Sequence, residues 1–161
     1  RSADDVRLMP GAVEAIRRLN DARWPVIVVT NQSGIARGLL THEDYDAVRN
    51  RMEALLSTDG ARIDASYMCP HHPDFTGACE CRKPDTLLFR RAATDHDLDT
   101  GASWFVGNRL RDVSPARALG GHGVLVPSAS TPEAEVASAR REFAVARSLD
   151  DAVTLVIESR R

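Results

Sequence analysis

The stretch PVIVVTNQSGIARG, residues 25–38, is the most informative about the fold class, because a short β-branched run is followed directly by a polar turn that contains glycine. Such a run is typical of a strand buried in a parallel sheet. The helical apolar spacing of residues 11–19 precedes it, so the first unit is a helix followed by a strand. The turn offers a hydroxyl, an amide and backbone N–H groups, which are the groups that bind a phosphate oxygen. A polar turn that only ends a strand is the alternative interpretation.

The alternation of helix and strand continues along the chain. Thr41 and Asp44 predict the cap of a helix that reaches about Leu56, and residues 63–68 resemble a second strand. The later elements are expected at residues 85–97 (helix), 103–106 (strand), up to 119–121 (helix), 123–126 (strand), 131–142 and 148–158 (helices). This order predicts one α/β domain over residues 1–161, a three-layer, doubly wound parallel sheet that binds ligands outside the carboxyl ends of its strands.

Composition limits the classes of partner. The 161 residues carry a net charge of -2, so no overall positive field attracts nucleic acid or an anionic membrane. No apolar run approaches the length that spans a bilayer, and the start does not resemble a signal peptide. We therefore expect a soluble, cytoplasmic monomer that binds a small molecule and neither nucleic acid nor membrane.

All three cysteines lie in one short segment, residues 69–84, which has no helical or strand periodicity. Cys69 and His71 are followed after seven residues by Cys79 and Cys81, which gives the three thiolates and one imidazole of a tetrahedral zinc site. Four protein ligands leave no position for water, so the zinc is expected to be structural. His72 is the alternative fourth ligand, and three reduced thiols without metal are the alternative to the site itself.

Two adjacent cations end this segment. Lys83 is the only lysine among 21 basic residues, which suggests a function that needs its compact ammonium group. Arg82 beside it offers a planar guanidinium, so the two residues could bind different parts of a phosphorylated substrate. Solvated surface charges are the alternative.

The segment VGNRLRD, residues 106–112, again places polar groups after a short strand, at the sheet edge expected for Thr30 and Asn31. Magnesium prefers carboxylate and water oxygens, whereas Asn108 offers only a neutral carbonyl. Asp112 keeps a carboxylate nearby, unless it is simply an acid that stabilises a helix N-terminus. These residues predict a weakened magnesium position.

In order along the chain, TNQSGIARG, CPHH…CECRKP and VGNRLRD resemble the D-glycero-D-manno-heptose-1,7-bisphosphate phosphatases and the related histidinol-phosphate phosphatases of the haloacid dehalogenase superfamily. The resemblance covers roughly residues 8–127. It implies a phosphoric monoester hydrolase that acts on a sugar phosphate, foremost D-glycero-D-manno-heptose 1,7-bisphosphate, through an aspartyl-phosphate intermediate. It also implies Mg²⁺ and Zn²⁺ as cofactors.

The resemblance assigns roles to individual residues. The catalytic residues it implies are Thr30 and Lys83. The substrate-binding residues it implies are Thr30, Asn31, Arg82, Lys83 and Arg109, the last at a position where the family usually has lysine. The zinc ligands it implies are Cys69, His71, Cys79 and Cys81. The magnesium position it implies consists of Asn108, where the family has aspartate, and Asp112.

The chain departs from the family at its first motif. The family opens with a strand that ends in Asp-x-Asp-Gly-Thr and supplies the nucleophile, and no such motif occurs in the 161 residues. In the family this first strand lies at the centre of the sheet, between the strands that end at Thr30 and Gly107, so its absence would expose two strand edges in a domain whose net stability is about 5–15 kcal/mol. Because Arg1 is not methionine, we expect an upstream segment that holds this strand. Asn108 is either natural or an engineered replacement of aspartate. The alternative function is a catalytically inactive, zinc-stabilised protein that binds phosphate esters.

Overall fold

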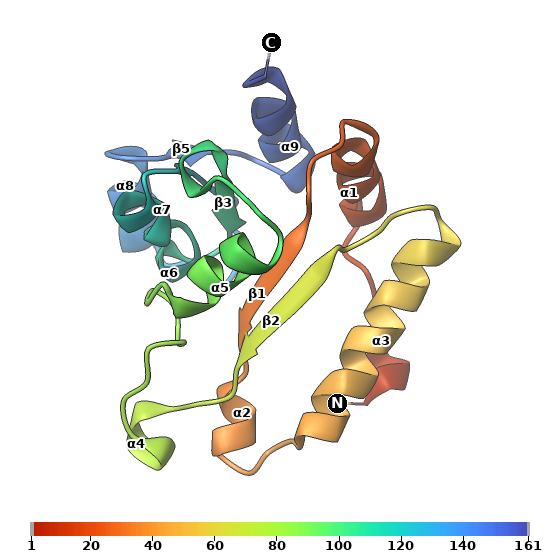
Figure 1. Cartoon of the computed structure of the whole chain (residues 1–161), viewed down its shortest axis with the longest axis vertical. Helices are drawn as coiled ribbons and strands as arrows, with labels where there is room; N and C mark the ends of the chain where they lie inside the picture. The colour runs from red at the N-terminus through yellow and green to blue at the C-terminus, as the bar shows by residue number, and fades with distance from the viewer. Residues whose placement is uncertain (1, 161) are drawn as a thin grey trace. The chain divides into compact units, whose positions relative to one another are not determined.

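The computed structural model describes residues 2–160 and divides into two compact units, one ending at Arg82 and the other beginning at Lys83. Every strand pairing in these residues is parallel, and helices alternate with the strands along the chain (Figure 1). The predicted α/β class is therefore confirmed. The extent of the domain, residues 1–161 as a single domain, stays a prediction.

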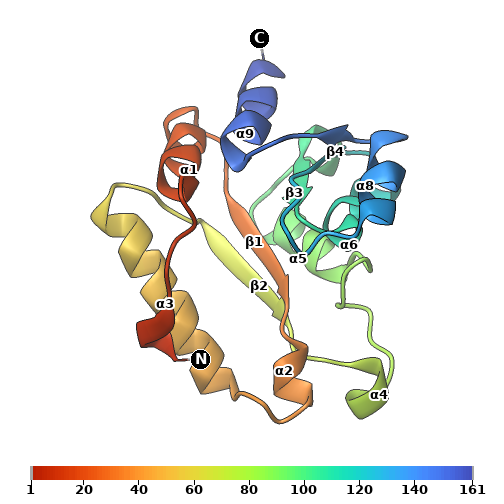
Figure 2. The same cartoon turned by 180° about the vertical axis from the view of Figure 1, so that it is seen from behind.

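The first unit contains one pair of strands. Its elements are α1 (Ala12–Asp21), β1 (Ile27–Asn31), α2 (Ser33–Ala36), α3 (His42–Thr58), β2 (Ala65–Cys69) and α4 (Pro73–Thr76), after a short 3₁₀ turn at Ala3–Asp5. β1 pairs with β2 in a register that places Asn31 opposite Cys69. Helices α1 and α3 lie on the same side of this strand pair in both views (Figures 1 and 2).

Local contacts explain where these elements begin. The Thr41 hydroxyl accepts a hydrogen bond from the Asp44 backbone N–H at 3.0 Å, and the Asp44 carboxylate accepts one from the Thr41 N–H at 2.8 Å, so the predicted cap of α3 is confirmed. Both strands begin two residues later than predicted. The Val26 N–H donates to the Asp64 carboxylate at 2.7 Å instead of to a strand partner.

The second unit contains three strands in the order β3-β4-β5. Its elements are α5 (Leu87–Asp95), a 3₁₀ turn (Thr100–Ala102), β3 (Trp104–Gly107), α6 (Leu110–Val113), α7 (Pro115–Leu119), β4 (His122–Leu125), α8 (Glu133–Arg140), β5 (Ala144–Val145) and α9 (Leu149–Glu158). Val113, Leu125 and Ala139 are fully buried and form one core cluster of this unit. The sheet therefore packs against α6 and α8.

One predicted helix consists of two. The helix expected to end at residues 119–121 is α6 followed by α7, because Pro115 lacks an N–H and starts a new first turn. Gly120 ends α7 in the left-handed conformation, with φ 72°. The two-residue strand β5 lies between the last two helices, in a stretch for which no strand was predicted.

In residues 2–160, β1 and β3 each have one edge without a partner strand. In this part of the chain β1 pairs only with β2, and β3 pairs only with β4. No helix of the described residues is both long enough and apolar enough to span a membrane. The three-layer arrangement of the two units stays a prediction.

Candidate functional site

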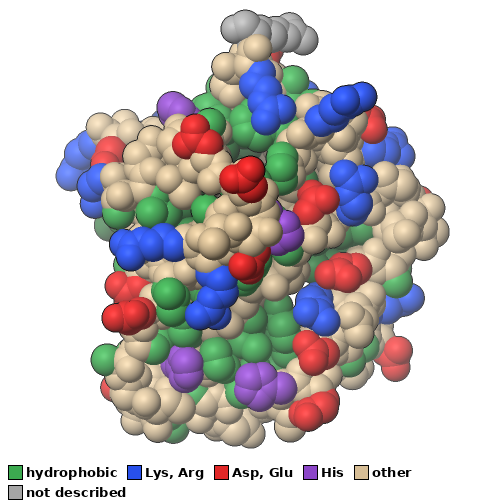
Figure 3. Space-filling model, viewed as in Figure 1, with side chains coloured by type: hydrophobic (Ala, Val, Ile, Leu, Met, Phe, Trp, Pro, Cys, Tyr) green, Lys and Arg blue, Asp and Glu red, His purple; other side chains and the backbone are tan. Residues whose placement is uncertain are grey.

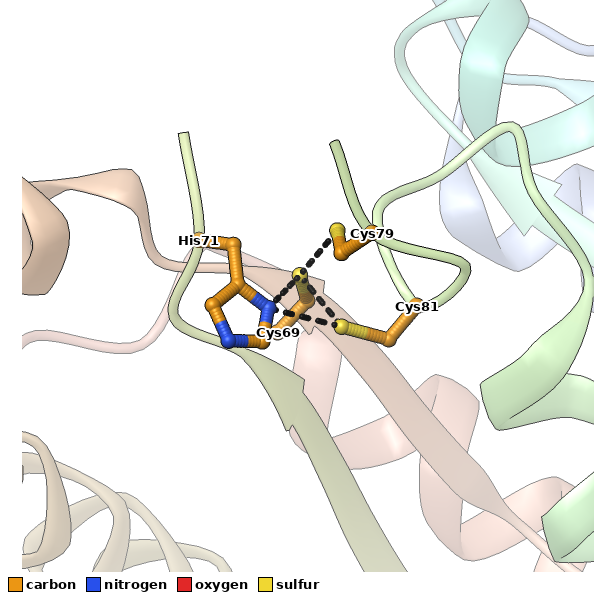
Figure 4. Close-up of side chains that lie close together, drawn as sticks. All are labelled: Cys69, His71, Cys79 and Cys81. Carbon is orange, nitrogen blue, oxygen red and sulfur yellow. Dashed lines mark hydrogen bonds between the residues drawn. The ribbon is translucent and has the colours of Figure 1, made fainter. Parts of the chain in front are cut away.

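The four predicted zinc ligands lie together in the first unit. Strand β2 ends at Cys69, and the following loop returns His71, Cys79 and Cys81 to it, so that the ligand atoms all lie within 4.8 Å of one another (Figure 4). The Cys69 Sγ lies 3.7 Å from His71 Nδ1 and 3.7 Å from Cys79 Sγ. Cys69 and Cys81 are buried, whereas Cys79 is partly exposed. The loop thus brings together four atoms of the types that zinc prefers.

The distances fit a tetrahedral zinc with one adjustment. Two sulfurs bound to zinc at about 2.3 Å lie about 3.8 Å apart, which the Cys69–Cys79 distance of 3.7 Å matches. The Cys69–Cys81 distance is 2.8 Å, so Cys81 must move outward by about 1 Å to bind the same ion. His72 points elsewhere, because its Nδ1 accepts a hydrogen bond from the Asp74 N–H at the start of α4. The residues fit zinc, with His71 as the histidine ligand.

The thiols of this cluster differ in acidity. Burial raises the pKa of Cys81 to about 12, and burial also raises the pKa of Cys69. At Cys79 the effect of burial is outweighed by hydrogen bonds from the backbone of Cys81 and Arg82, so the pKa of this thiol is lowered. Because zinc binds thiolates, metal binding must displace protons from the two buried thiols.

The polar turn after β1 forms hydrogen bonds with the start of the metal loop, which comprises residues 69–81. The Gln32 N–H donates to the Cys69 carbonyl at 2.8 Å, and the Ala36 N–H donates to the Pro70 carbonyl at 3.1 Å. The Gln32 side-chain amide donates to the Thr30 hydroxyl at 3.1 Å. The candidate phosphate-binding turn and the candidate zinc site therefore share backbone contacts.

Arg82 belongs to the same loop. One of its guanidinium nitrogens donates to the His71 carbonyl at 3.2 Å, so this side chain supports the backbone of a candidate zinc ligand. Its substrate-binding role stays a prediction.

Lys83 is held in the second unit by a nearly buried ion pair. Its Nζ lies 2.7 Å from Asp112 Oδ1, and the two side chains are only 11% and 13% exposed. The other oxygen of Asp112 accepts a hydrogen bond from the Arg109 N–H at 3.0 Å. A Cβ on Gly107 would lie 2.3 Å from the Asp112 Cβ, so only glycine permits this approach. Lys83 is therefore not a solvated surface charge.

The turn after β3 has internal partners that the sequence did not indicate. The Asn108 side chain donates from Nδ2 to the Ser128 hydroxyl at 3.1 Å. The backbone carbonyl of Asn108 accepts from the Thr131 hydroxyl at 2.7 Å. Arg109 donates from Nε to Glu135 at 2.7 Å, and the same carboxylate accepts from the Leu110 N–H at 3.1 Å. The helix α8 and the residues before it thus hold the turn in place. No local sequence motif marks Glu135 as a partner of this turn, and only its contacts with Arg109 and Leu110 in the structure reveal it.

Asn108 and Asp112 do not by themselves form a magnesium site. Asp112 offers the only carboxylate of the pair, and both of its oxygens already have protein partners. Asn108 adds a neutral carbonyl oxygen, a weak ligand for a cation that prefers carboxylates. Among residues 2–160, the only group of three or more clustered Cys, His, Asp or Glu ligands is the Cys3His set.

Comparison with known proteins defines the class. The model of the HAD-hydrolase-like family matches residues 80–152, which include Lys83, the turn after β3 and Asp112. The crystal structure of D,D-heptose 1,7-bisphosphate phosphatase from B. bronchiseptica, complexed with magnesium and phosphate, is similar over 98% of this chain and 88% of that chain, with a TM-score of 0.86 and 33% identity. The fold is that of a HAD-like hydrolase.

Curated relatives narrow the class to one family. The D-glycero-β-D-manno-heptose-1,7-bisphosphate 7-phosphatase of Yersinia pestis is 36% identical over 138 residues, which is 82% of this chain and 73% of the relative. The enzyme of the same name from Bordetella bronchiseptica is 40% identical over 120 residues, 74% of this chain and 66% of the relative. The chain belongs to the family of heptose-bisphosphate phosphatases, as the motifs indicated. It spans about two thirds to three quarters of the length of these relatives.

Proposed function

We propose that the chain, when preceded by an Asp-x-Asp-Gly-Thr strand, is a phosphatase that hydrolyses a sugar phosphate, foremost D-glycero-D-manno-heptose 1,7-bisphosphate. The observation that carries the proposal is the similarity of nearly the whole chain to a heptose-bisphosphate phosphatase solved with magnesium and phosphate. The nearly buried Lys83–Asp112 pair adds chemical support, because a charged group so well shielded from water acts strongly on a phosphoryl group.

The roles follow from the chemistry of each side chain. Thr30 and Asn31 bind phosphoryl oxygens through their hydroxyl and amide groups, and the Lys83 ammonium neutralises charge on the phosphoryl group. Asp112 holds the Lys83 ammonium in position through the 2.7 Å contact. Arg82 and Arg109 contact the rest of the substrate, each through guanidinium nitrogens that do not donate to His71 or Glu135.

Two metal ions complete the proposal. Zinc binds Cys69, His71, Cys79 and Cys81 and orders the loop without taking part in the reaction. Magnesium, when bound, would screen the negative charge of the phosphoryl group. Asn108 and Asp112 form only part of its site, so we propose weak magnesium binding and a requirement for further carboxylates.

The compartment and the oligomeric state are also proposals. Zinc-bound thiolates fit a reducing cytoplasm, where cysteines remain available as metal ligands. The predicted monomer is tested by sedimentation of the purified chain, which should show a mass near 17.6 kDa.

Two observations favour a second function, a phosphate-ester-binding protein without catalysis. The 161 residues contain no Asp-x-Asp-Gly-Thr motif, and asparagine stands at the magnesium position. Such a protein would keep the binding groups Thr30, Asn31 and Lys83 and release no phosphate.

A direct experiment separates the two functions. Phosphate release from heptose bisphosphate is measured for residues 1–161 and for the same chain preceded by the Asp-x-Asp-Gly-Thr strand of the Bordetella relative. We expect no release by the first protein and release by the second that Lys83→Ala abolishes. Zinc content and circular dichroism show that both are folded. Substrate binding without any release by the second, folded protein would establish the binding function instead.

A further inference from the structure

We propose that Gln32 is a positioning residue that fixes the direction in which the Thr30 hydroxyl donates its hydrogen. Gln32 would act through Thr30 and not by touching the phosphate. This inference rests on the proposed function, because it requires Thr30 to be a ligand of the phosphoryl group.

The hydrogen bond between the two side chains carries the proposal. The Gln32 Nε2 donates to Thr30 Oγ1 at 3.1 Å. A threonine hydroxyl has one hydrogen to donate and two lone pairs that accept. Because the amide N–H occupies a lone pair, the hydroxyl hydrogen is left to point at another acceptor. An incoming phosphate oxygen is such an acceptor, and it needs a donor from Thr30.

The competing acceptor is weak. Within the described residues the Thr30 hydroxyl has one other contact, with the Asn31 carbonyl at 3.5 Å. That distance is well beyond the usual 2.5–3.0 Å of an O–H···O hydrogen bond. The Thr30 hydroxyl can therefore easily redirect its hydrogen bond from the Asn31 carbonyl to a phosphate oxygen.

The backbone of Gln32 is fixed, which gives its side chain a defined starting point. Its N–H donates to the Cys69 carbonyl at 2.8 Å and so extends the β1–β2 ladder by one bond beyond Asn31. Four residues later the Ala36 N–H donates to the Pro70 carbonyl. In residues 2–160 the side-chain amide of Gln32 makes no hydrogen bond other than the one to the Thr30 hydroxyl.

The test is a double-mutant cycle on phosphate binding. Calorimetry measures the dissociation constant of inorganic phosphate for the zinc-loaded chain, for Thr30→Val, for Gln32→Met and for the double variant. Valine and methionine keep the approximate size of the side chain and remove the hydrogen bond. We expect Thr30→Val to weaken binding about tenfold or more and Gln32→Met about threefold to tenfold, the effect of one neutral hydrogen bond. The double variant should bind as Thr30→Val does.

A matched background separates positioning from support of the backbone. In a Thr30→Ser chain the hydroxyl is kept, so Gln32→Met should again weaken binding about threefold to tenfold. Thermal midpoint and zinc content should be equal in all of these variants. An equal loss from Gln32→Met in the valine background, or no loss in the parent, overturns the proposal while the proposed function stands. A parent chain that binds no phosphate, or binding unaffected by Thr30→Val, overturns the assigned role of Thr30 and the inference with it.

Discussion

Predicted metal ligands lie in two regions, the metal loop (residues 69–81) and the turn after β3 (residues 107–112). The two regions differ in what the ligand atoms face. In the metal loop the four ligand atoms face one another (Figure 4). In the turn the carboxylate of Asp112 faces Lys83 and a backbone N–H. Residue type and spacing are enough to predict a closed tetrahedral site, because all ligands come from one segment. An open site depends on partners from elsewhere in the chain.

Two adjacent histidines of the metal loop, His71 and His72, differ in their surroundings. Histidine side chains are visible on the face drawn in Figure 3, beside hydrophobic and acidic side chains. His71 and His72 are neighbours in the sequence, yet only His71 lies among the thiols, while His72 packs its ring edge-on against Phe75. This pair therefore offers a matched comparison for the metal loop.

The largest expected effect is on zinc binding. Purified parent protein should contain about one zinc ion per chain, and His71→Ala should weaken zinc binding by about a hundredfold or more, because it opens the closed coordination shell. His72→Ala is the control and should retain the metal. Zinc is measured by mass spectrometry after dialysis against a weak chelator. Equal retention by both variants would show that His71 is not a ligand.

The pH dependence of zinc binding should be steep. Burial raises the pKa of Cys69 and that of Cys81, the latter to about 12, so both thiols are protonated in the metal-free chain at neutral pH. Each must lose its proton to bind zinc, so affinity rises with pH, by about tenfold per pH unit for each of these thiols. Competition with a chelator at pH 6.5, 7 and 7.5 measures the slope. An affinity independent of pH would contradict the assignment of both thiols as ligands.

The turn after β3 should respond through stability. Asp112→Ala removes the carboxylate that pairs with the nearly buried Lys83 ammonium and should lower the free energy of unfolding by about 3 kcal/mol. The control is Glu142→Ala, which removes the exposed pair with Arg117 and should change this free energy little. Urea denaturation of the three proteins measures both effects. A loss at Asp112 no larger than at Glu142 would show that the buried pair does not stabilise the unit.

Much of the fold could be predicted from local sequence. A β-branched run marked β1, and the Thr41–Asp44 pair marked the start of α3, because each signal lies within a few neighbouring residues. The two-residue strand β5 gave no such signal, since its length is set by its pairing with β4.

The candidate site could be predicted only in part, for the same reason. Cys69, His71, Cys79 and Cys81 lie within 13 residues, so their spacing was informative. The partners of Asn108 and Arg109 are 20 and 26 residues away, and sequence patterns do not show which side chains meet over such separations. Gln32 was within reach, two residues after Thr30, but only the structure shows its amide at the hydroxyl.

We propose a phosphatase whose magnesium position is weakened by Asn108. The decisive variant is Asn108→Asp, made in the chain that is preceded by the Asp-x-Asp-Gly-Thr strand. Restoring one negative charge to a hard-cation site should strengthen magnesium dependence. Phosphate release from heptose bisphosphate at millimolar magnesium should rise about tenfold or more, equal to at least about 1.4 kcal/mol of transition-state stabilisation. Phosphate affinity should change much less. A folded variant that binds phosphate esters and hydrolyses none of them would contradict the claim.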